Sequence, residues 1–145
     1  MTPEQIKAIQ DSFAKVAPIS EQAAALFYGR LFEITPSVKP LFRGDMKEQG
    51  RKLMAMLGVV VNGLGNLETI LPAASALAKR HVRYGVKPSD YVPVGEALLW
   101  TLEKGLGAQW TAELAAAWAA AYGVLSEFMI AEAYGRPPRP SEASP

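Results

Sequence analysis

The spacing of apolar residues along the chain predicts helices throughout. From residue 3 to residue 134, apolar positions recur three or four residues apart, the spacing that places side chains on one face of an α-helix. No segment alternates apolar and polar residues for long, as a half-buried strand would. We expect helices over residues 3–17, 20–34, 46–64, 67–83, 90–106 and 111–134, and a short one over 36–42. The pattern therefore predicts an all-α fold of seven to eight helices.

Local signals mark where these helices begin and end. Thr2 can cap the first helix, with Pro3 at its first position and Gln5 completing a capping box. Pro18 ends that helix, and Ser20 is expected to cap the second. Glycines predict where the later helices stop, at Gly63, Gly65, Gly85, Gly105 and Gly107.

Length and composition predict one domain. A chain of 145 residues suits a single core, and half of its residues are hydrophobic while a fifth are charged. We expect residues 1–135 to form this domain. Residues 136–145 are rich in proline, and we expect them to form a disordered tail.

The net charge and the length of the longest apolar stretch give no sign of a nucleic-acid or membrane partner. The chain has 15 basic and 14 acidic residues, a formal net charge of +1. Its longest apolar stretch, from Leu114 to Leu125, is shorter than the roughly 20 residues that a membrane span needs. The N-terminus lacks the basic and apolar regions of a signal peptide. We expect a cytoplasmic protein without a membrane span.

The chain has no cysteine and one histidine, His81. The lack of cysteine excludes disulfides, iron–sulfur clusters, thiol catalysis and covalent haem attachment. A single histidine argues against structural zinc, and neither a Gly-x-Ser-x-Gly elbow nor a phosphate-binding glycine motif is present.

His81 lies on the apolar face of its predicted helix. Ile70, Ala74 and Leu77 precede it at helical spacing, so its ring is expected to point into the protein. Two interpretations remain open on this segment alone. The ring is either a core histidine whose nitrogens bond to the backbone, or an axial ligand to a haem iron.

The order of helices, together with five short segments, resembles the globin family. These segments are residues 26–32 (LFYGRLF), 40–42 (PLF), 49–54 (QGRKLM), 80–86 (RHVRYGV) and 90–99 (DYVPVGEALL). The resemblance is narrower to single-domain bacterial haemoglobins and to the haem domain of flavohaemoglobins, and it extends from about Ile6 to Tyr134. It implies a globin fold around a pocket for non-covalent haem b, iron protoporphyrin IX.

The resemblance gives roles to residues on both sides of the haem. His81 becomes the proximal iron ligand, with its second ring nitrogen donating to the backbone carbonyl near Leu77. Tyr28 and Gln49 become distal donors to bound dioxygen, which would slow its release. Tyr28 could instead be a core tyrosine with a backbone partner, and Gln49 a solvated residue. Gly50 aligns opposite Ala24, where two small residues would let their helices cross closely.

The remaining pocket residues implied by the resemblance are mostly apolar. They are Phe42, Leu53, Met56, Leu77, Val86, Tyr91, Val94, Leu98, Tyr122 and Leu125, with Lys52 as a partner for a haem propionate. Lys79, Arg80 and Arg83 are weaker propionate candidates, since such residues are more often solvated.

One position departs from the flavohaemoglobin pattern. A glutamate on the last helix of flavohaemoglobins, with a tyrosine that matches Tyr91, bonds the proximal histidine, and Ala133 stands in its place here. Glu132 is one residue away and should point about 100° around the helix. We therefore expect no strong anionic effect on His81.

The resemblance implies reversible binding of dioxygen, and also of carbon monoxide and nitric oxide, at a pentacoordinate or weakly hexacoordinate ferrous haem. A nitric oxide dioxygenase served by a separate reductase is an alternative, since the resemblance covers only the haem domain of flavohaemoglobins. A gas sensor is less favoured because no output domain follows, and a haem-free helical interaction module would require accidental spacing. The single histidine excludes bis-histidine ligation, and the sequence leaves monomer or homodimer open.

Overall fold

Six α-helices and five short 3₁₀ segments make up the part of the chain that the structure describes. The computed structural model describes residues 2–42, 44–83 and 86–134, with the backbone alone at Arg83. The α-helices are α1 (Pro3–Val16), α2 (Ser20–Ile34), α3 (Met46–Asn62), α4 (Leu71–Arg83), α5 (Tyr91–Leu106) and α6 (Ala112–Tyr134). The 3₁₀ segments are η1 (Ala17–Ile19), η2 (Pro36–Leu41), η3 (Leu67–Thr69), η4 (Pro88–Asp90) and η5 (Gly107–Gln109). No strand occurs in these ranges, so the all-α prediction is confirmed.

The predicted start of α1 is confirmed in detail. The Thr2 hydroxyl accepts from the Gln5 backbone N–H at 3.1 Å, and the Gln5 side chain accepts from the Thr2 N–H at 2.9 Å. Pro3 occupies the first helical position, where its missing N–H has no consequence.

Three boundaries differ from the prediction, each for a backbone reason. Ser20 makes no cap hydrogen bond, because η1 leads directly into α2 and Ser20 is already helical. Pro72 lacks a backbone N–H and fits only the first turn of a helix, so α4 begins at Leu71 and the predicted helix over 67–83 is divided into η3 and α4. The segment 36–42 is 3₁₀ rather than α, and it contains Pro36 and Pro40.

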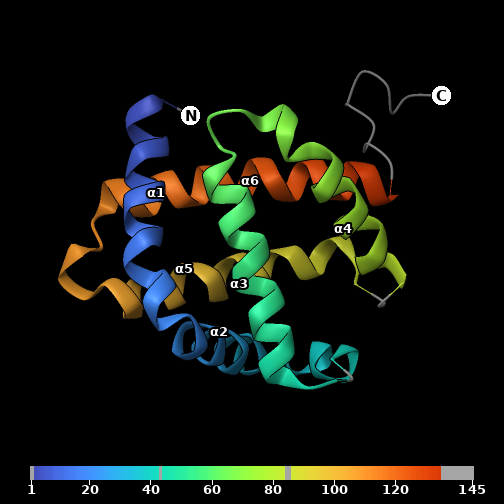
Figure 1. Ribbon diagram of the computed structural model, residues 1–145. Helices are drawn as coiled ribbons and strands as arrows, with labels where there is room; N and C mark the ends of the chain where they lie inside the picture. The colour runs from blue at the N-terminus through green and yellow to red at the C-terminus, as the bar shows by residue number, and fades with distance from the viewer. Residues whose placement is uncertain (1, 43, 84–85, 135–145) are drawn as a thin grey trace, which may run out of the picture.

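The helices cross in layers around two long ones. Figure 1 shows α5 and α6 running across the molecule, with α1 and α3 in front of them, α2 at one edge and α4 at the opposite end from α1. The helix α2 packs on α5 and α3, while α4 packs mainly on α6. In the interior, Trp118 of α6 donates its indole N–H to the buried Ser12 hydroxyl of α1 at 3.0 Å. This bond ties the first helix to the last.

The helix α6 is long and apolar enough to cross a membrane by length and composition alone. Its packing offers another reason for that composition. Leu114, Trp118, Ala121 and Met129 are buried against the other helices. Glu113 and Glu127 are exposed on the same helix.

Candidate functional site

His81 lies half-buried near the end of α4, on the face that carries the buried Ala74 and Ala78. The carbonyl of Leu77, one turn earlier, hydrogen-bonds the imidazole. Burial lowers the pKa of His81, and the neighbouring Arg80 lowers it further, against the opposing effect of the Leu77 bond. The ring is therefore neutral at pH 7, the form in which a ring nitrogen can bind a metal ion.

Tyrosines from α5 and α6 surround His81. The Tyr91 ring lies nearly parallel to the imidazole, with 6.4 Å between ring centroids and 25° between planes. Tyr122 donates its hydroxyl to the Tyr91 carbonyl at 2.6 Å, which fixes the first turn of α5 against α6. Tyr134 donates to the carbonyl of Val86, just beyond α4. The chain thus holds the surroundings of His81 from three sides.

Gly95 makes this arrangement possible, and the sequence prediction missed its role. A Cβ at Gly95 would lie 2.7 Å from the Tyr122 ring, so only glycine lets the tyrosine pack across α5. The signal was a glycine inside an otherwise favourable apolar helix, which often marks a close approach. The bond from Tyr134 was also missed, because it joins residues 48 positions apart.

The Tyr91 hydroxyl is buried and has no hydrogen-bond partner among the described residues. Burial, together with the nearby Tyr134, raises its pKa to about 12, so it stays a neutral donor. Ala133 is partly buried in the same cluster while Glu132 is exposed, as the departure from the flavohaemoglobin pattern predicts. A buried hydroxyl without a partner costs about 1–3 kcal/mol, so the Tyr91 hydroxyl is available to donate to a water molecule or a ligand.

Tyr28 and Gln49, the two predicted distal residues, come together in the structure. The Tyr28 hydroxyl donates to the backbone carbonyl of Gln49 at 3.4 Å, a long bond. The Tyr28 side chain is buried among aromatic rings, edge-on to Phe27 at 5.1 Å and to Phe42 at 5.2 Å. Burial raises the pKa of Tyr28 to about 12, so the hydroxyl remains a donor at any physiological pH. The backbone partner is the alternative that the sequence left open, whereas the Gln49 side chain is half-buried.

Gly50 and Ala24 explain why these two residues meet. A Cβ at Gly50 would lie 2.8 Å from the Ala24 Cβ, closer than real side chains approach. The predicted crossing of α2 and α3 at two small residues is confirmed. The close crossing brings residue 49 within reach of Tyr28.

The predicted lining residues belong to two separate apolar clusters. Those that pack in the larger cluster are Tyr28, Phe42, Leu53, Met56, Val94, Leu98, Tyr122 and Leu125. Those that pack in the smaller cluster, beside His81, are Leu77, Val86, Tyr91 and again Leu125. Although the two clusters share Leu125, α3 and α4 are not among the helix pairs that pack extensively on each other within the described ranges. The apolar interior is therefore divided between the α3 side and the α4 side.

Most of these apolar side chains are only partly covered by the protein. Every lining residue except Tyr28, Tyr91 and Leu98 is half-buried. These half-exposed apolar side chains come mainly from α3, α4, α5 and α6, and they suit packing against a flat apolar group. The predicted propionate partner is less well supported, because Lys52 is exposed and its nearest carboxylate, Glu48, lies 4.0 Å away on the same helix.

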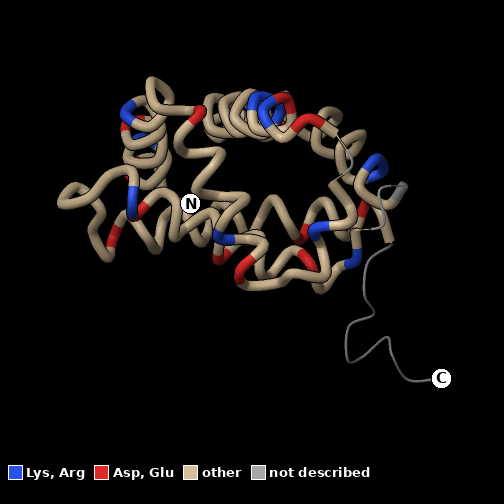
Figure 2. The backbone as a smooth tube through the Cα atoms, turned by 90° about the horizontal axis from the view of Figure 1, so that it is seen from below, with Lys and Arg blue, Asp and Glu red and all other residues tan. Residues whose placement is uncertain are grey.

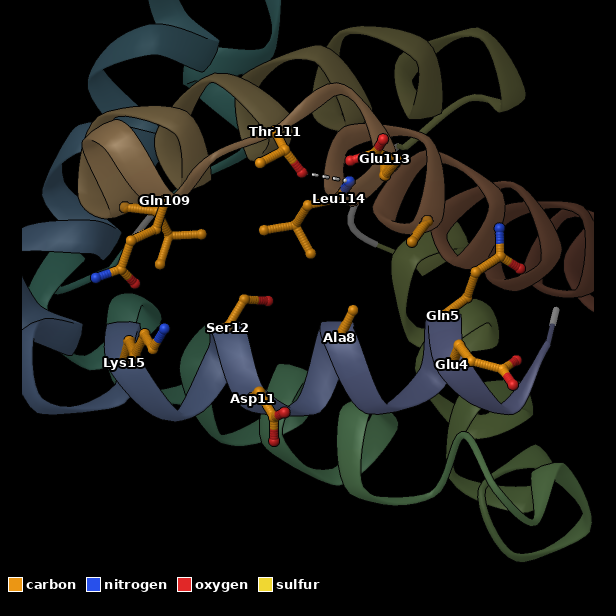
Figure 3. A pocket seen from close by; sticks show the side chains of 12 residues that line it. Glu4, Gln5, Ala8, Asp11, Ser12, Lys15, Gln109, Thr111, Glu113 and Leu114 are labelled. Atoms are coloured by element: carbon orange, nitrogen blue, oxygen red, sulfur yellow. Dashed lines mark hydrogen bonds between the residues drawn. The ribbon is translucent and has the colours of Figure 1, made fainter.

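A separate cavity of about 410 Å³ lies between α1 and the start of α6 (Figure 3). Charged residues among those that line it are Glu4, Asp11, Lys15 and Glu113, and Ala8, Leu106, Leu114 and Ala117 add apolar surface. It contains none of the predicted site residues. Volume alone would therefore point to a different region from the predicted site residues around His81 and Tyr28.

Comparison with known proteins decides the family. The model of the Globin family matches residues 25–129. The chain belongs to the globin family. The globin match includes Tyr28, Gln49 and His81, whereas α1 precedes it.

Three flavohaemoproteins are similar to this globin. The one from Rhodopirellula baltica is 29% identical over 133 residues, and those from Bordetella parapertussis and Bordetella bronchiseptica are each 31% identical over 136 residues. Each alignment covers 90% of this chain and 33% of the relative. The globin thus spans about a third of the length of these relatives.

A solved structure supports the same conclusion. A bacterial globin from Campylobacter jejuni superimposes with a TM-score of 0.80 and is 30% identical in sequence. The match covers 90% of this chain and 95% of the other. The predicted globin fold is confirmed, and the family and its relatives imply a haem cofactor.

Proposed function

We propose that this globin holds haem b between α3 and α4 and binds dioxygen reversibly, releasing it slowly. One observation carries the proposal. Half-exposed apolar side chains belong to two separate clusters, with a neutral imidazole beside one and a buried phenol in the other. When bound, haem would supply a ferrous iron that binds diatomic gases, and the protein would supply a ligand to that iron.

His81 would be the protein ligand to the haem iron. Burial keeps its ring neutral, and the bond with the Leu77 carbonyl orients the ring and increases its basicity toward a metal. Ala133 stands where flavohaemoglobins have a carboxylate, so this position of α6 supplies no negative charge. This favours reversible gas binding over peroxidase-like chemistry.

Tyr28 would supply the main hydrogen bond to the gas. Its present bond to the Gln49 carbonyl is long, so the hydroxyl can turn toward a better acceptor at little cost. The Gln49 amide is a second donor. Each bond contributes about 1–1.5 kcal/mol, and two of them slow oxygen release roughly ten- to a hundredfold.

An absorption spectrum tests this proposal. Purified protein titrated with haemin should bind one equivalent and give ferric, ferrous and carbon monoxide spectra of a histidine-ligated haem. A protein that takes up no haemin, or that gives a spectrum unchanged by carbon monoxide, would contradict it.

A second candidate function is nitric oxide dioxygenation, in which nitric oxide, dioxygen and one electron yield nitrate. It is favoured by the similarity of this chain to one third of three flavohaemoproteins. The same distal residues would polarise the dioxygen, and a separate reductase would supply the electron. Sustained nitric oxide consumption with an added reductase supports this candidate, and a single turnover that then stops excludes it.

A further inference from the structure

The charged residues of the chain are divided between two parts of the molecule. Residues 36–87, from η2 to just beyond α4, contain nine of the 15 basic residues and three of the 14 acidic residues. The net charge of this stretch is +6, and that of all other residues is −5. The formal charge of +1 for the whole chain conceals this separation.

The described basic side chains of this stretch are exposed. They are Lys39, Lys47, Arg51, Lys52, Lys79, Arg80 and Lys87. The 4.0 Å contact between Lys52 and Glu48 is the one ion pair among them. Elsewhere, Lys7 of α1 pairs with Asp11 at 3.1 Å, and Arg30 of α2 pairs with Glu33 at 3.3 Å. Most of the positive charge on α3 and α4 is therefore not neutralised within the described chain.

These basic residues lie on the two helices that hold the candidate site. Lys47 and Arg51 are on the exposed side of α3, whose inner side carries Leu53. Lys79 and Arg80 immediately precede His81 in sequence, on the exposed side of α4. Figure 2 shows basic residues on α3 and at the side of the molecule that carries α4. The two propionates of a haem would offset at most two charges, so most of the +6 would remain.

We propose that this α3/α4 basic surface, formed by the exposed cations of α3 and α4, docks an acidic electron-transfer protein that carries a flavin or an iron–sulfur cluster. The proposal rests on the proposed haem site, because the electron must enter between these two helices. One electron leaves the reduced cofactor of the donor and converts ferric iron to ferrous iron, while no bond forms or breaks and no proton moves.

Charge complementarity selects this partner. Opposite charges on two proteins accelerate their encounter and orient them, most strongly at low ionic strength. A membrane or nucleic acid would also attract cations, but neither supplies the electron that a ferric haem needs. The acidic remainder of the molecule, at −5, would turn this surface toward an anionic partner.

A pair of charge-reversal variants tests the surface. The site pair is Lys47→Glu with Lys79→Glu, and the control pair is Lys7→Glu with Lys15→Glu on α1, which changes the net charge equally. All four lysines are exposed. The probe is purified flavodoxin, a small acidic flavin protein. Its affinity is measured by calorimetry and its reduction of the ferric haem by stopped flow, at low and high ionic strength.

At low ionic strength we expect the site pair to weaken binding and slow reduction about fivefold or more, and the control pair to change either by less than about twofold. The difference should vanish at high ionic strength. Equal effects of the two pairs, or binding that does not depend on salt, would overturn the proposal.

Two further measurements distinguish a failure of the proposed haem site from a failure of the proposed protein partner. If the charge-dependent binding occurs in protein that takes up no haemin, the surface stands and the proposed function fails. Stronger binding to phosphatidylserine vesicles than to flavodoxin, with the same dependence on the site pair, would overturn the protein partner in favour of a membrane surface.

Discussion

At the scale of single residues, Tyr28 is the side chain on which the proposed slow release of oxygen would depend. Replacing Tyr28 by Phe keeps the ring that packs against Phe27 and Phe42 but removes the donor. We expect the oxygen dissociation rate to rise about tenfold, since one such bond contributes about 1–1.5 kcal/mol. Carbon monoxide, which is less polar, should show a smaller change. Stopped-flow replacement of oxygen by carbon monoxide measures the rate, and an unchanged value removes Tyr28 from the mechanism.

The same tyrosine should make the fold sensitive to alkali. Its pKa is about 12 when folded, whereas tyrosine in an unfolded chain titrates near 10. The unfolded chain therefore loses this proton first, and stability falls as the pH rises from 10 toward 12. Below pH 10 both states keep the proton and Tyr28 adds no pH dependence.

Unfolding by urea between pH 9 and 11 measures this effect. Relative to Tyr28→Phe, the parent should lose up to about 1.4 kcal/mol for each pH unit above 10. Parallel curves for the two proteins would show that the hydroxyl is not buried.

Around the candidate site, the sequence predicted that Tyr28 and Gln49 lie together but not how they are bonded. Apolar spacing and the globin resemblance singled out these two residues and His81. The orphaned Tyr91 hydroxyl and the long bond of Tyr28 could not be predicted, because both depend on how helices distant in sequence are placed. The Leu77 bond could be anticipated, because it lies within one helical turn of His81.

At the scale of helices, the crossing of α2 and α3 depends on Gly50. The substitution Gly50→Ala places a Cβ 2.8 Å from the Ala24 Cβ, so the two helices must separate. We expect the free energy of unfolding to fall by about 1–3 kcal/mol, as in other overpacked contacts. Oxygen release should also become faster, because Gln49 moves away from Tyr28.

The matched control for this change is Gly29→Ala in α2. A Cβ at Gly29 meets nothing within 4 Å, and alanine is the better helix former, so stability should rise by up to about 1 kcal/mol. Urea unfolding of both variants checks the pair, and equal effects of the two substitutions would contradict a close crossing at Gly50.

Helix bounds were predictable where a local signal determines them. The capping box at Thr2 and the glycine at Gly107, whose φ is +57°, are such signals. The start of α4 was not placed correctly, since apolar spacing continues through η3 and only the backbone geometry of Pro72 separates the two.

At the scale of the whole molecule, the net charge can be counted from the sequence, but a single total does not show how the charges are distributed. The charge of +1 gave no sign of an anionic partner, yet nine of the 15 basic residues lie in residues 36–87, which include α3 and α4, and 11 of the 14 acidic residues lie elsewhere. The globin fold could be predicted because its helix order and short motifs are local. The division of the core into two clusters required the tertiary structure.

The central claim is that His81 alone holds the iron of a haem placed between α3 and α4. The most direct test replaces His81 by Gly and adds free imidazole to the haemin-treated protein. We expect the variant to lose the spectrum of a histidine-ligated haem and imidazole to restore it, because the ring would then bind in the cavity left behind. A variant with the parent haem content and ferrous spectrum in the absence of imidazole would contradict the account.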